Sequence, residues 1–220
     1  MKRFPVTILP FILRSMHLEI LTKEQHNLLP LIKKYSKNYY LVGGTAIALH
    51  IGHRGSIDFD LFTDANVNGV SIKKQVQGSR FISNIIVQKP DQIHFTINNV
   101  KLTFFQFPFS IEATTYHEKY FRMPDLLTLA AMKAFALGGR GKWKDYVDLY
   151  FMLKKHFTVS EICNKAKELF TDVFNPVLFS KQLCYFDDIS FDEPVEFMPG
   201  FEVSEKEVKE FLIDAALTGF

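Results

Sequence analysis

The sequence predicts an α+β protein, with a small mixed sheet in an N-terminal lobe and helices in the lobe that follows. Two observations predict this class. Up to about residue 110, segments with the two-residue alternation of strands are interspersed with short helical segments. From Pro124 onward, apolar residues recur at the spacing of helices. We therefore expect an α/β lobe over residues 1–110 and a helical lobe over residues 111–220 that completes a cleft.

The first half of the predicted sheet lobe combines helices with short strands. Residues 21–35 carry apolar side chains at helical spacing, and Thr22 with Gln25 forms a candidate capping box. Residues 39–42 form a short apolar run that predicts a buried strand, which ends at a pair of glycines. Residues 45–50 predict a helix that Gly52 terminates. The next strand is expected over residues 57–62.

The second half of this lobe predicts a hairpin. Asn98-Asn99 tolerates positive φ and separates two alternating runs, so the runs should pair as antiparallel strands. The predicted segments are a helix over 70–80, strands over 81–88, 92–97 and 100–107, and helices over 125–137, 144–153, 159–170 and 204–216.

The composition is that of a folded globular protein, with 47% hydrophobic and 23% charged residues. The 23 phenylalanines suit a core that contains strands. A net charge of +2 does not by itself indicate a nucleic-acid binder. Cys163 and Cys184 have no His or Cys neighbour at metal-binding spacing, so we interpret them as reduced thiols of a cytoplasmic protein.

Neither the N-terminal segment nor the hydropathy of the chain predicts membrane association. Residues 1–19 begin with Lys2 and Arg3, are interrupted by prolines and contain no small-residue cleavage site, so we do not interpret them as a signal peptide. No stretch approaches the roughly 20 apolar residues that span a bilayer. We therefore predict no membrane partner.

The strongest functional pattern is Gly43-Gly44-Thr45 followed by Asp58 and Asp60. Residues two apart in a strand face the same side, so the two carboxylates should point together. Such a pair favours a hard cation, Mg²⁺ first and Mn²⁺ second. The glycines allow close backbone approach, and the N-terminus of the following helix offers N–H groups to phosphate oxygens. Either half alone is common in turns and edge strands, but the two in this order favour a nucleoside triphosphate site.

This arrangement resembles a known family. The segment from Leu41 to Arg54, with Asp58-Phe59-Asp60 after it, resembles the AbiEii/AbiGii nucleotidyltransferase toxins of the DNA polymerase β-like superfamily. Residues 125–150 resemble the motif of that family's helical lobe, and residues 183–188 resemble a segment near its C-terminus. The resemblance runs from about residue 28 to residue 215.

The resemblance implies a polymerase β-like nucleotidyltransferase lobe followed by a helical lobe. It implies a toxin of a toxin–antitoxin or phage-defence module, which transfers a nucleoside monophosphate from an NTP to a hydroxyl, such as a tRNA or other RNA 3′ end, and has a cognate antitoxin. The resemblance also assigns a role to individual residues of this sequence. Asp58 and Asp60 would bind Mg²⁺ and catalyse, with Lys133 and Asp145 as further catalytic residues, and Gly43, Gly44, Thr45, Arg54, Arg140 and Lys144 would bind the nucleotide.

The charges of the helical lobe leave two interpretations open. Lys133, Arg140, Lys142 and Lys144 lie close to a glycine-rich break and could reach a triphosphate or an RNA backbone. They could equally belong to a solvated helix end. The carboxylates at 145 and 148 share one helical face and could pair with Lys144 or Arg140 instead of acting in catalysis. We favour function for Lys133 and expect its removal to weaken NTP binding with little effect on stability.

One position departs from the family pattern. The resemblance predicts a third carboxylate on a neighbouring strand, and the matching residue is Thr103. Asp91 and Glu112 are substitutes that do not match the strand position. The rival reading is therefore a degenerate relative that binds a nucleotide or a partner without catalysis. A zinc site at His50 and His53 lacks a third ligand at suitable spacing, and His53-Arg54 better fits phosphate binding or a helix cap.

Overall fold

The computed structural model describes residues 16–78, 80, 82–117, 120–139 and 141–219. Arg140 and most of the segment in which we excluded a signal peptide lie outside these residues. The sheet lobe contains η1 (Leu18–Ile20), α1 (Lys23–Tyr35), β1 (Tyr40–Val42), α2 (Gly43–Ile51), β2 (Phe59–Thr63), α3 (Gly69–Gln77), β3 (Asn84–Lys89), β4 (Gln92–Ile97), β5 (Val100–Gln106), β6 (Thr115–His117) and β7 (Phe121–Met123). The helical lobe contains α4 (Leu126–Leu137), α5 (Trp143–Lys155), α6 (Val159–Phe170), η2 (Thr171–Val173), α7 (Pro176–Leu183) and α8 (Glu205–Thr218).

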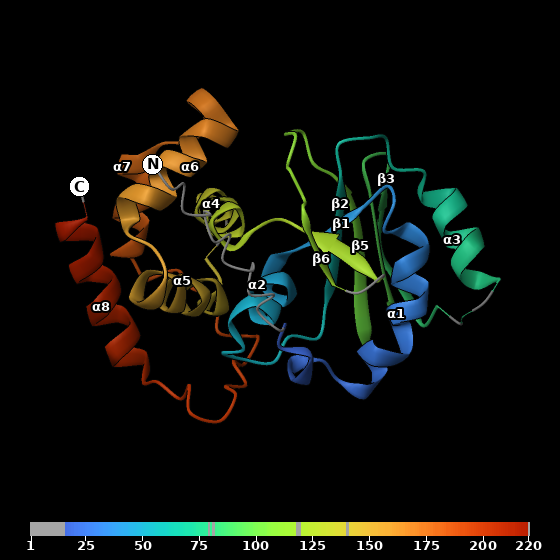
Figure 1. The fold of residues 1–220 in the computed structure, drawn as a ribbon, viewed down its shortest axis with the longest axis horizontal. Coiled ribbons are helices and arrows are strands. Elements are labelled where there is room, and N and C mark those ends of the chain that lie inside the picture. Colours follow the sequence, from blue (N-terminus) through green and yellow to red (C-terminus); the bar gives the residue numbers. More distant parts are fainter. Residues whose placement is uncertain (1–15, 79, 81, 118–119, 140, 220) are drawn as a thin grey trace, which may run out of the picture.

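These elements confirm the α+β class. Figure 1 shows the sheet with α1 and α3 in one lobe and helices α4 to α8 gathered in the other. Within the described residues, β1 to β5 form a five-stranded mixed sheet in the order β1-β2-β5-β4-β3. β2 and β5 run parallel, and the other neighbours are antiparallel. The parallel pair brings the strand of the aspartates beside the strand of Thr103.

The two faces of this sheet have different roles. Phe59, Leu102 and Phe104 are fully buried on one face. Tyr35 of α1 packs edge-on against Phe104 on that face, with ring centroids 4.8 Å apart. The alternation of a strand then turns Asp60 and the residues beside it to the opposite face. Helix α1 therefore supplies the hydrophobic backing that leaves the other face available for polar groups.

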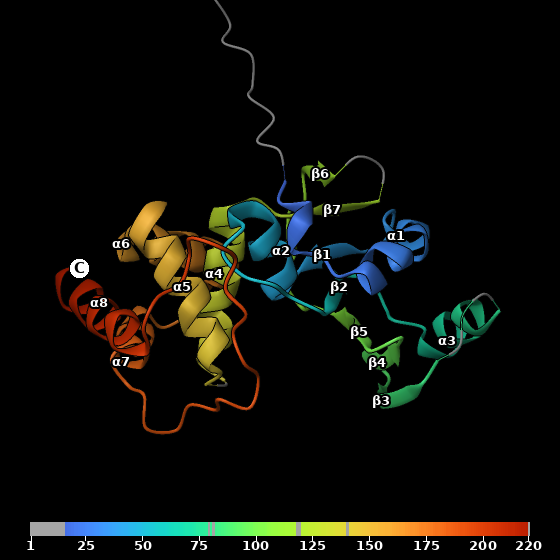
Figure 2. The same cartoon turned by 90° about the horizontal axis from the view of Figure 1, so that it is seen from below.

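Helix α2 joins the two lobes. It follows β1 directly, and its residues Ala46, Ile47 and Leu49 are almost completely buried. α2 packs against both α4 and α5, and Figure 2 shows it between the sheet and the helical lobe. Gly52 ends the helix at φ 75°, as predicted, and the chain then returns to β2. One buried apolar helix therefore fixes the sheet relative to the helical lobe.

The local signals of the sequence are largely confirmed. Thr22 and Gln25 form the predicted capping box at the start of α1. Asn98 and Asn99 adopt φ of 49° and 65°, which joins β4 and β5 by the two-residue turn expected of this dipeptide. The β6–β7 hairpin and α7 were not predicted. This hairpin packs against β1, and the predicted boundary near residue 110 falls between β5 and β6.

Two further expectations concern the thiols and the membrane. Cys163 is buried, Cys184 is exposed, and both carry free thiols, as the sequence spacing indicated. Burial raises the pKa of Cys163 to about 11, which makes it an unreactive thiol. In the part of the chain that the structure describes, no helix has the length and hydrophobicity needed to cross a membrane.

Candidate functional site

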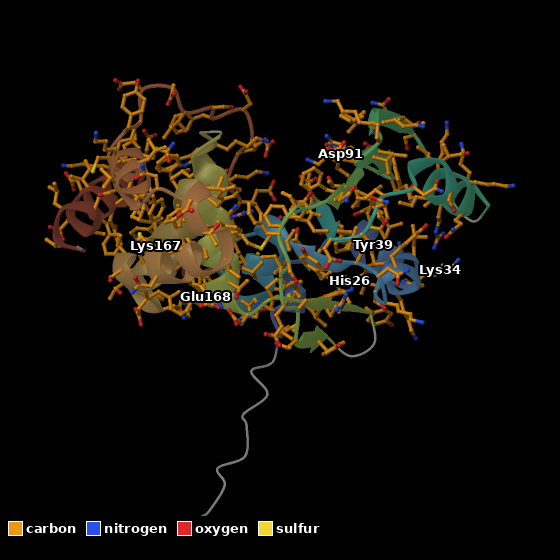
Figure 3. The ribbon with its side chains drawn as sticks, turned by 90° about the horizontal axis from the view of Figure 1, so that it is seen from above. His26, Lys34, Tyr39, Asp91, Lys167 and Glu168 are labelled. Carbon is orange, nitrogen blue, oxygen red and sulfur yellow. The ribbon has the colours of Figure 1, made fainter. Side chains whose placement is uncertain are left out.

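A cleft of about 300 Å³ lies between the open face of the sheet and the helical lobe. Its walls come from the start of α2, from β2, β4 and β5, and from α4, the start of α5 and a loop after α7. Figure 3 shows the two lobes from above, with Lys34 on one lobe and Lys167 on the other. The predicted site residues that line the cleft are Gly43, Gly44, Arg54, Asp58, Asp60, Lys133, Lys144 and Asp145.

The two aspartates lie together on the sheet wall of the cleft. Asp60 is in β2, between its register partners Val42 and Thr103, and Asp58 precedes that strand by one residue. The Asp58 carboxylate lies 3.0 Å from the Nζ of Lys101. Burial of Lys101 lowers its pKa, but Asp58 outweighs this effect and raises the pKa overall. Lys101 is therefore a cation that neutralises one carboxylate of the pair.

Both glycines at the start of α2 are required by close packing. Gly43 has φ 74°, and a Cβ at this position would collide with Oδ2 of Asp60. A Cβ at Gly44 would collide with Nη2 of Arg54. No described side chain caps the N-terminus of α2, so its first backbone N–H groups are available to an anion at the cleft wall. The Gly-Gly pair thus brings a carboxylate, a guanidinium and a helix N-terminus together.

Thr45 has a supporting position instead of a place in the cleft wall. Its side chain is buried, and its hydroxyl donates to the backbone carbonyl oxygen of Asp58. Ser56 Oγ lies 2.8 Å from the same hydroxyl. Thr45 therefore fixes the segment that carries Asp58 to α2. Nucleotide contact by Thr45 remains a prediction, and the structure gives this residue the additional task of positioning Asp58.

Behind the cleft lies a buried network of charges centred on Asp148. Arg54 donates from Nε and Nη2 to the two oxygens of Asp148, at 2.7 and 2.8 Å. His53 Nε2 lies 2.8 Å from Oδ1, and Lys133 Nζ lies 3.1 Å from Oδ2. Burial opposes ionisation of Asp148, but Arg54 and Lys133 outweigh it and hold its pKa well below the usual range. The network ties the α2–β2 connection to α4 and α5.

This network corrects our expectation for Lys133. Only 5% of its surface is exposed, and its Nζ donates to Asp145 at 2.6 Å besides facing Asp148. Removal of a buried, paired charge is costly, because its partners lose their compensation. The expectation that Lys133 contributes little to stability is therefore wrong. Asp145 and Asp148 of α5 thus both pair with Lys133, whereas Lys144, one of the partners we considered for them, pairs with Glu193. Arg140, the other partner we considered, lies outside the described residues.

Lys142 and Lys144 at the start of α5 share one acidic partner. Glu193, from the loop after α7, forms ion pairs with both lysines inside the cleft. Burial opposes ionisation of Glu193, but its hydrogen bonds with Lys142 and Lys144 lower its pKa to about 2. Backbone hydrogen bonds from Trp143 to Ser190 and from Ser190 to Gly141 fasten this loop to the start of α5. The carboxylate of Glu193 thus neutralises Lys142 and Lys144, the two lysines that we considered as phosphate ligands.

The two histidines that were considered for zinc are used elsewhere. His50 Nε2 lies 3.1 Å from the carbonyl oxygen of Pro124, and His53 faces Asp148. Burial lowers the pKa of His53. Among the described residues, no group of three or more His, Cys, Asp or Glu side chains could hold a metal ion. The described protein therefore offers no site that encloses a metal with its own side chains alone.

The donors present nevertheless fit Mg²⁺ in the presence of a nucleotide. Mg²⁺ is usually held by one or two carboxylates together with substrate phosphates, and it keeps several waters. Asp58 and Asp60 line one wall and would supply two such oxygen ligands. The missing Cβ of Gly43 leaves room for the Asp60 carboxylate to turn into the cleft. An ion shared with a triphosphate fits this donor set, whereas a resident structural ion does not.

Sequence reasoning missed four charged or titratable residues of the site, namely His94, Lys101, Asp148 as a buried anchor, and Glu193. A signal existed for His94, because it and Thr103 are equally distant from the Asn98-Asn99 turn and are register partners. Lys101 could have been found from its alternation with Thr103. Nothing in the local pattern connects Glu193 or Asp148 with residues so distant in sequence.

Comparisons with known proteins identify the family of this chain. The sequence profile of the family described as "Nucleotidyl transferase AbiEii toxin, Type IV TA system" matches residues 31–217. The uncharacterized protein aq_aa25 of Aquifex aeolicus (strain VF5) is 29% identical over 207 residues, which cover 87% of this chain and 98% of that protein.

Two solved structures share the fold. MenT4, a nucleotidyltransferase toxin from Mycobacterium tuberculosis H37Rv, is 13% identical with a TM-score of 0.61, over 89% of this chain and 82% of that chain. JHP933 from Helicobacter pylori is 16% identical with a TM-score of 0.52, over 90% of this chain and 92% of that chain. Because the family profile covers most of the sequence and the fold agrees with it, the chain belongs to the AbiEii nucleotidyltransferase toxin family.

Proposed function

We propose that the cleft binds an NTP with Mg²⁺ and transfers its nucleoside monophosphate to a hydroxyl of RNA, with a tRNA 3′ end as the first candidate. The observation that carries this proposal is the position of Asp58 and Asp60 on one wall of a cleft whose opposite wall carries Lys142 and Lys144. One wall suits a cation, and the other suits the phosphates that share it. Mn²⁺ is the alternative cation.

Each wall has a separate task in this proposal. When bound, Mg²⁺ would neutralise the phosphates and polarise the α-phosphoryl group. Asp58 and Asp60 would hold it, and the N–H groups at the start of α2 would bind phosphate oxygens. Lys142 and Lys144 would bind the leaving pyrophosphate after Glu193 has moved away. Lys133 and Asp145 would complete the wall of the helical lobe, and Arg54 would hold the α2–β2 connection in place.

The biological setting follows from the family. We infer that this protein is the toxin of a toxin–antitoxin or phage-defence module and acts in the cytoplasm under the control of a cognate antitoxin. Modification of a common RNA would explain toxicity, because loss of functional RNA stops growth. An antitoxin gene next to the gene for this protein would be the simplest genetic support for this setting.

A second candidate function is nucleotide binding without catalysis. Thr103 favours it, because a neutral hydroxyl occupies the strand position at which the family resemblance predicts the third carboxylate. Under this reading Mg²⁺ raises the affinity for NTP, but no nucleotide is transferred. We favour the enzyme with slow turnover, since the aspartates, the glycines and the buried network are all intact.

One assay separates the two functions. The purified full chain is incubated with each α-radiolabelled NTP, Mg²⁺ and total bacterial RNA, and the RNA is resolved on a gel. The enzyme predicts label in an RNA band with at least one NTP, and loss of that label in EDTA. Tight NTP binding with no labelled RNA under any condition would support the binding module instead.

A further inference from the structure

Three polar residues form a row across the sheet face that lines the cleft. Asp60 in β2 is the register partner of Thr103 in β5, and Thr103 is the register partner of His94 in β4. All three line the cleft. The row places His94 one strand beyond the position that lacks a carboxylate, on the same face as the aspartates.

The backbone of β4 fixes the direction of His94. Its neighbours Ile93 and Phe95 are fully buried on the opposite face of the sheet. A one-residue slip of the strand would bury the imidazole and expose these apolar side chains, so the register is strongly determined. The imidazole therefore stays on the cleft side with Thr103.

The Nε2 atom of His94 is shielded from water and has no hydrogen-bond partner among the residues that the structure describes. Such an atom is unusual, because buried polar groups in folded proteins nearly always have a partner, and an orphan often marks a functional group. His94 lies in the wall of the nucleotide cleft, so a ligand hydroxyl can supply that partner. The orphan nitrogen indicates a contact that forms only with substrate.

Burial of the ring favours the neutral form of His94, and the charges around it do not reverse this effect. Burial lowers its pKa, and Lys101 and Lys89 add to this effect. Asp60 and Asp91 act in the opposite direction but do not reverse it, and Figure 3 labels Asp91 at the turn before β4. Gln92, the remaining cleft residue of β4, is uncharged. A neutral imidazole can accept a proton, which a threonine hydroxyl cannot do at neutral pH.

We propose that His94 is the catalytic proton acceptor of the transfer reaction, in place of the carboxylate that Thr103 does not provide. This inference rests on the proposed function. The attacking hydroxyl oxygen forms a bond with the α-phosphorus, and the bond from that phosphorus to the bridging oxygen of pyrophosphate breaks with its electron pair. The hydroxyl proton passes to Nε2 of His94, and the imidazolium returns it to solvent after pyrophosphate leaves.

The test compares His94→Gln with His26→Gln. Glutamine keeps a hydrogen-bonding side chain of similar size but cannot accept the proton, and His26 is an exposed histidine of α1 that Figure 3 labels. We expect His94→Gln to reduce the single-turnover transfer rate by about 100-fold or more, the lower end of general-base effects. The Kd of Mg²⁺–NTP should stay within about twofold of wild type, since affinity scales with contacts that this substitution leaves in place.

The pH profile gives a second readout. Transfer requires neutral His94, so the wild-type rate should rise with pH through a midpoint below 6.5, the ordinary pKa of histidine. This ascending limb should disappear in His94→Gln. The double variant His94→Gln with Thr103→Asp should regain activity, because a carboxylate then stands at the family position. That rescue excludes a merely structural histidine.

The outcomes separate the two proposals. An active wild type whose His94→Gln variant keeps the same rate and pH profile overturns the assignment of His94 alone. Equal loss of NTP binding and of transfer in His94→Gln also overturns it, since that result describes a structural residue. A wild type that transfers no nucleotide to any RNA overturns the proposed function, and the assignment of His94 with it.

Discussion

Asp60 and Thr103 are register partners on the adjacent parallel strands β2 and β5, so their side chains emerge next to one another into the cleft. The family resemblance matches Thr103 to the strand position of the third carboxylate, and the register places it beside Asp60. The sheet wall of the cleft therefore has two carboxylates where the family resemblance predicts three. In the function that we propose, this relationship would determine both the metal affinity and the route of the proton.

Thr103→Asp should make the protein more dependent on metal. A third carboxylate beside Asp60 repels it, so in EDTA the variant should lose roughly 0.5–3 kcal/mol of unfolding free energy. Mg²⁺ should restore this loss, because a ligand bound only by the folded state stabilises it. Thermal unfolding with and without Mg²⁺ measures the effect, and uncharged Thr103→Asn is the matched control. Equal Mg²⁺ responses in the two variants would show that position 103 does not face the metal site.

Lys133 should prove essential for stability. Lys133→Met keeps most of the side-chain volume but leaves Asp145 and Asp148 without their shared cation. We expect the free energy of unfolding to fall by about 3–5 kcal/mol, the usual cost of breaking a buried ion pair. Lys167→Met, at an exposed position of α6, is the control and should change the free energy of unfolding by less than about 0.5 kcal/mol. Melting of Lys133→Met within a degree of the control would contradict the buried network.

Glu193→Gln should tighten nucleotide binding. The substitution removes the carboxylate that pairs with Lys142 and Lys144, so a triphosphate no longer has to displace it. Partly exposed pairs contribute up to about 1 kcal/mol, so the Kd for NTP should fall roughly two- to fivefold by calorimetry. Glu196→Gln removes the same charge from an exposed position of the same loop and should leave the Kd unchanged. Weaker binding in Glu193→Gln would mean that this carboxylate organises the site instead of occupying it.

The buried network should make stability depend on acid pH. The folded state holds the pKa of Asp148 well below its usual range through Arg54, Lys133 and His53. Its contribution is therefore complete above the unfolded pKa of about 3.9 and is lost as the pH falls below that value towards the folded pKa. Denaturant unfolding between neutral pH and pH 3 measures this loss. Asp148→Asn should be less stable at neutral pH and should show a flatter decline in acid, and a decline parallel to wild type would refute the assignment.

The sequence was sufficient for features that depend on local pattern. The capping box at Thr22, the Asn98-Asn99 turn and the common face of Asp58 and Asp60 follow from spacing alone, and the structure has all of them. The register of Thr103 beside Asp60 also followed, once the family pattern indicated which strand to compare. These features need only neighbours in the chain or a motif with a known order.

Features that depend on distant contacts could not be predicted. Arg54 and Asp148 lie 94 positions apart, and no periodicity indicates that a guanidinium beside a glycine pair will face that carboxylate. Lys133 has apolar neighbours on its helix, but we expected it to contribute little to stability, because the sequence does not show the carboxylates that neutralise it. Glu193 lies in a loop without a periodic pattern, so only the structure shows its ion pair with Lys144.

The most direct test of this account is nucleotide transfer by Asp60→Asn, measured beside the wild type with the same labelled NTP, RNA and Mg²⁺. The asparagine keeps the shape of the side chain and removes one metal-binding charge, so the fold and its melting temperature should be preserved. We expect transfer to be abolished and the Mg²⁺-dependent part of NTP affinity to fall with it, and Asp58→Asn should behave alike. Unchanged transfer, or unchanged Mg²⁺–NTP binding in both variants by calorimetry, would contradict the metal site at the centre of the account.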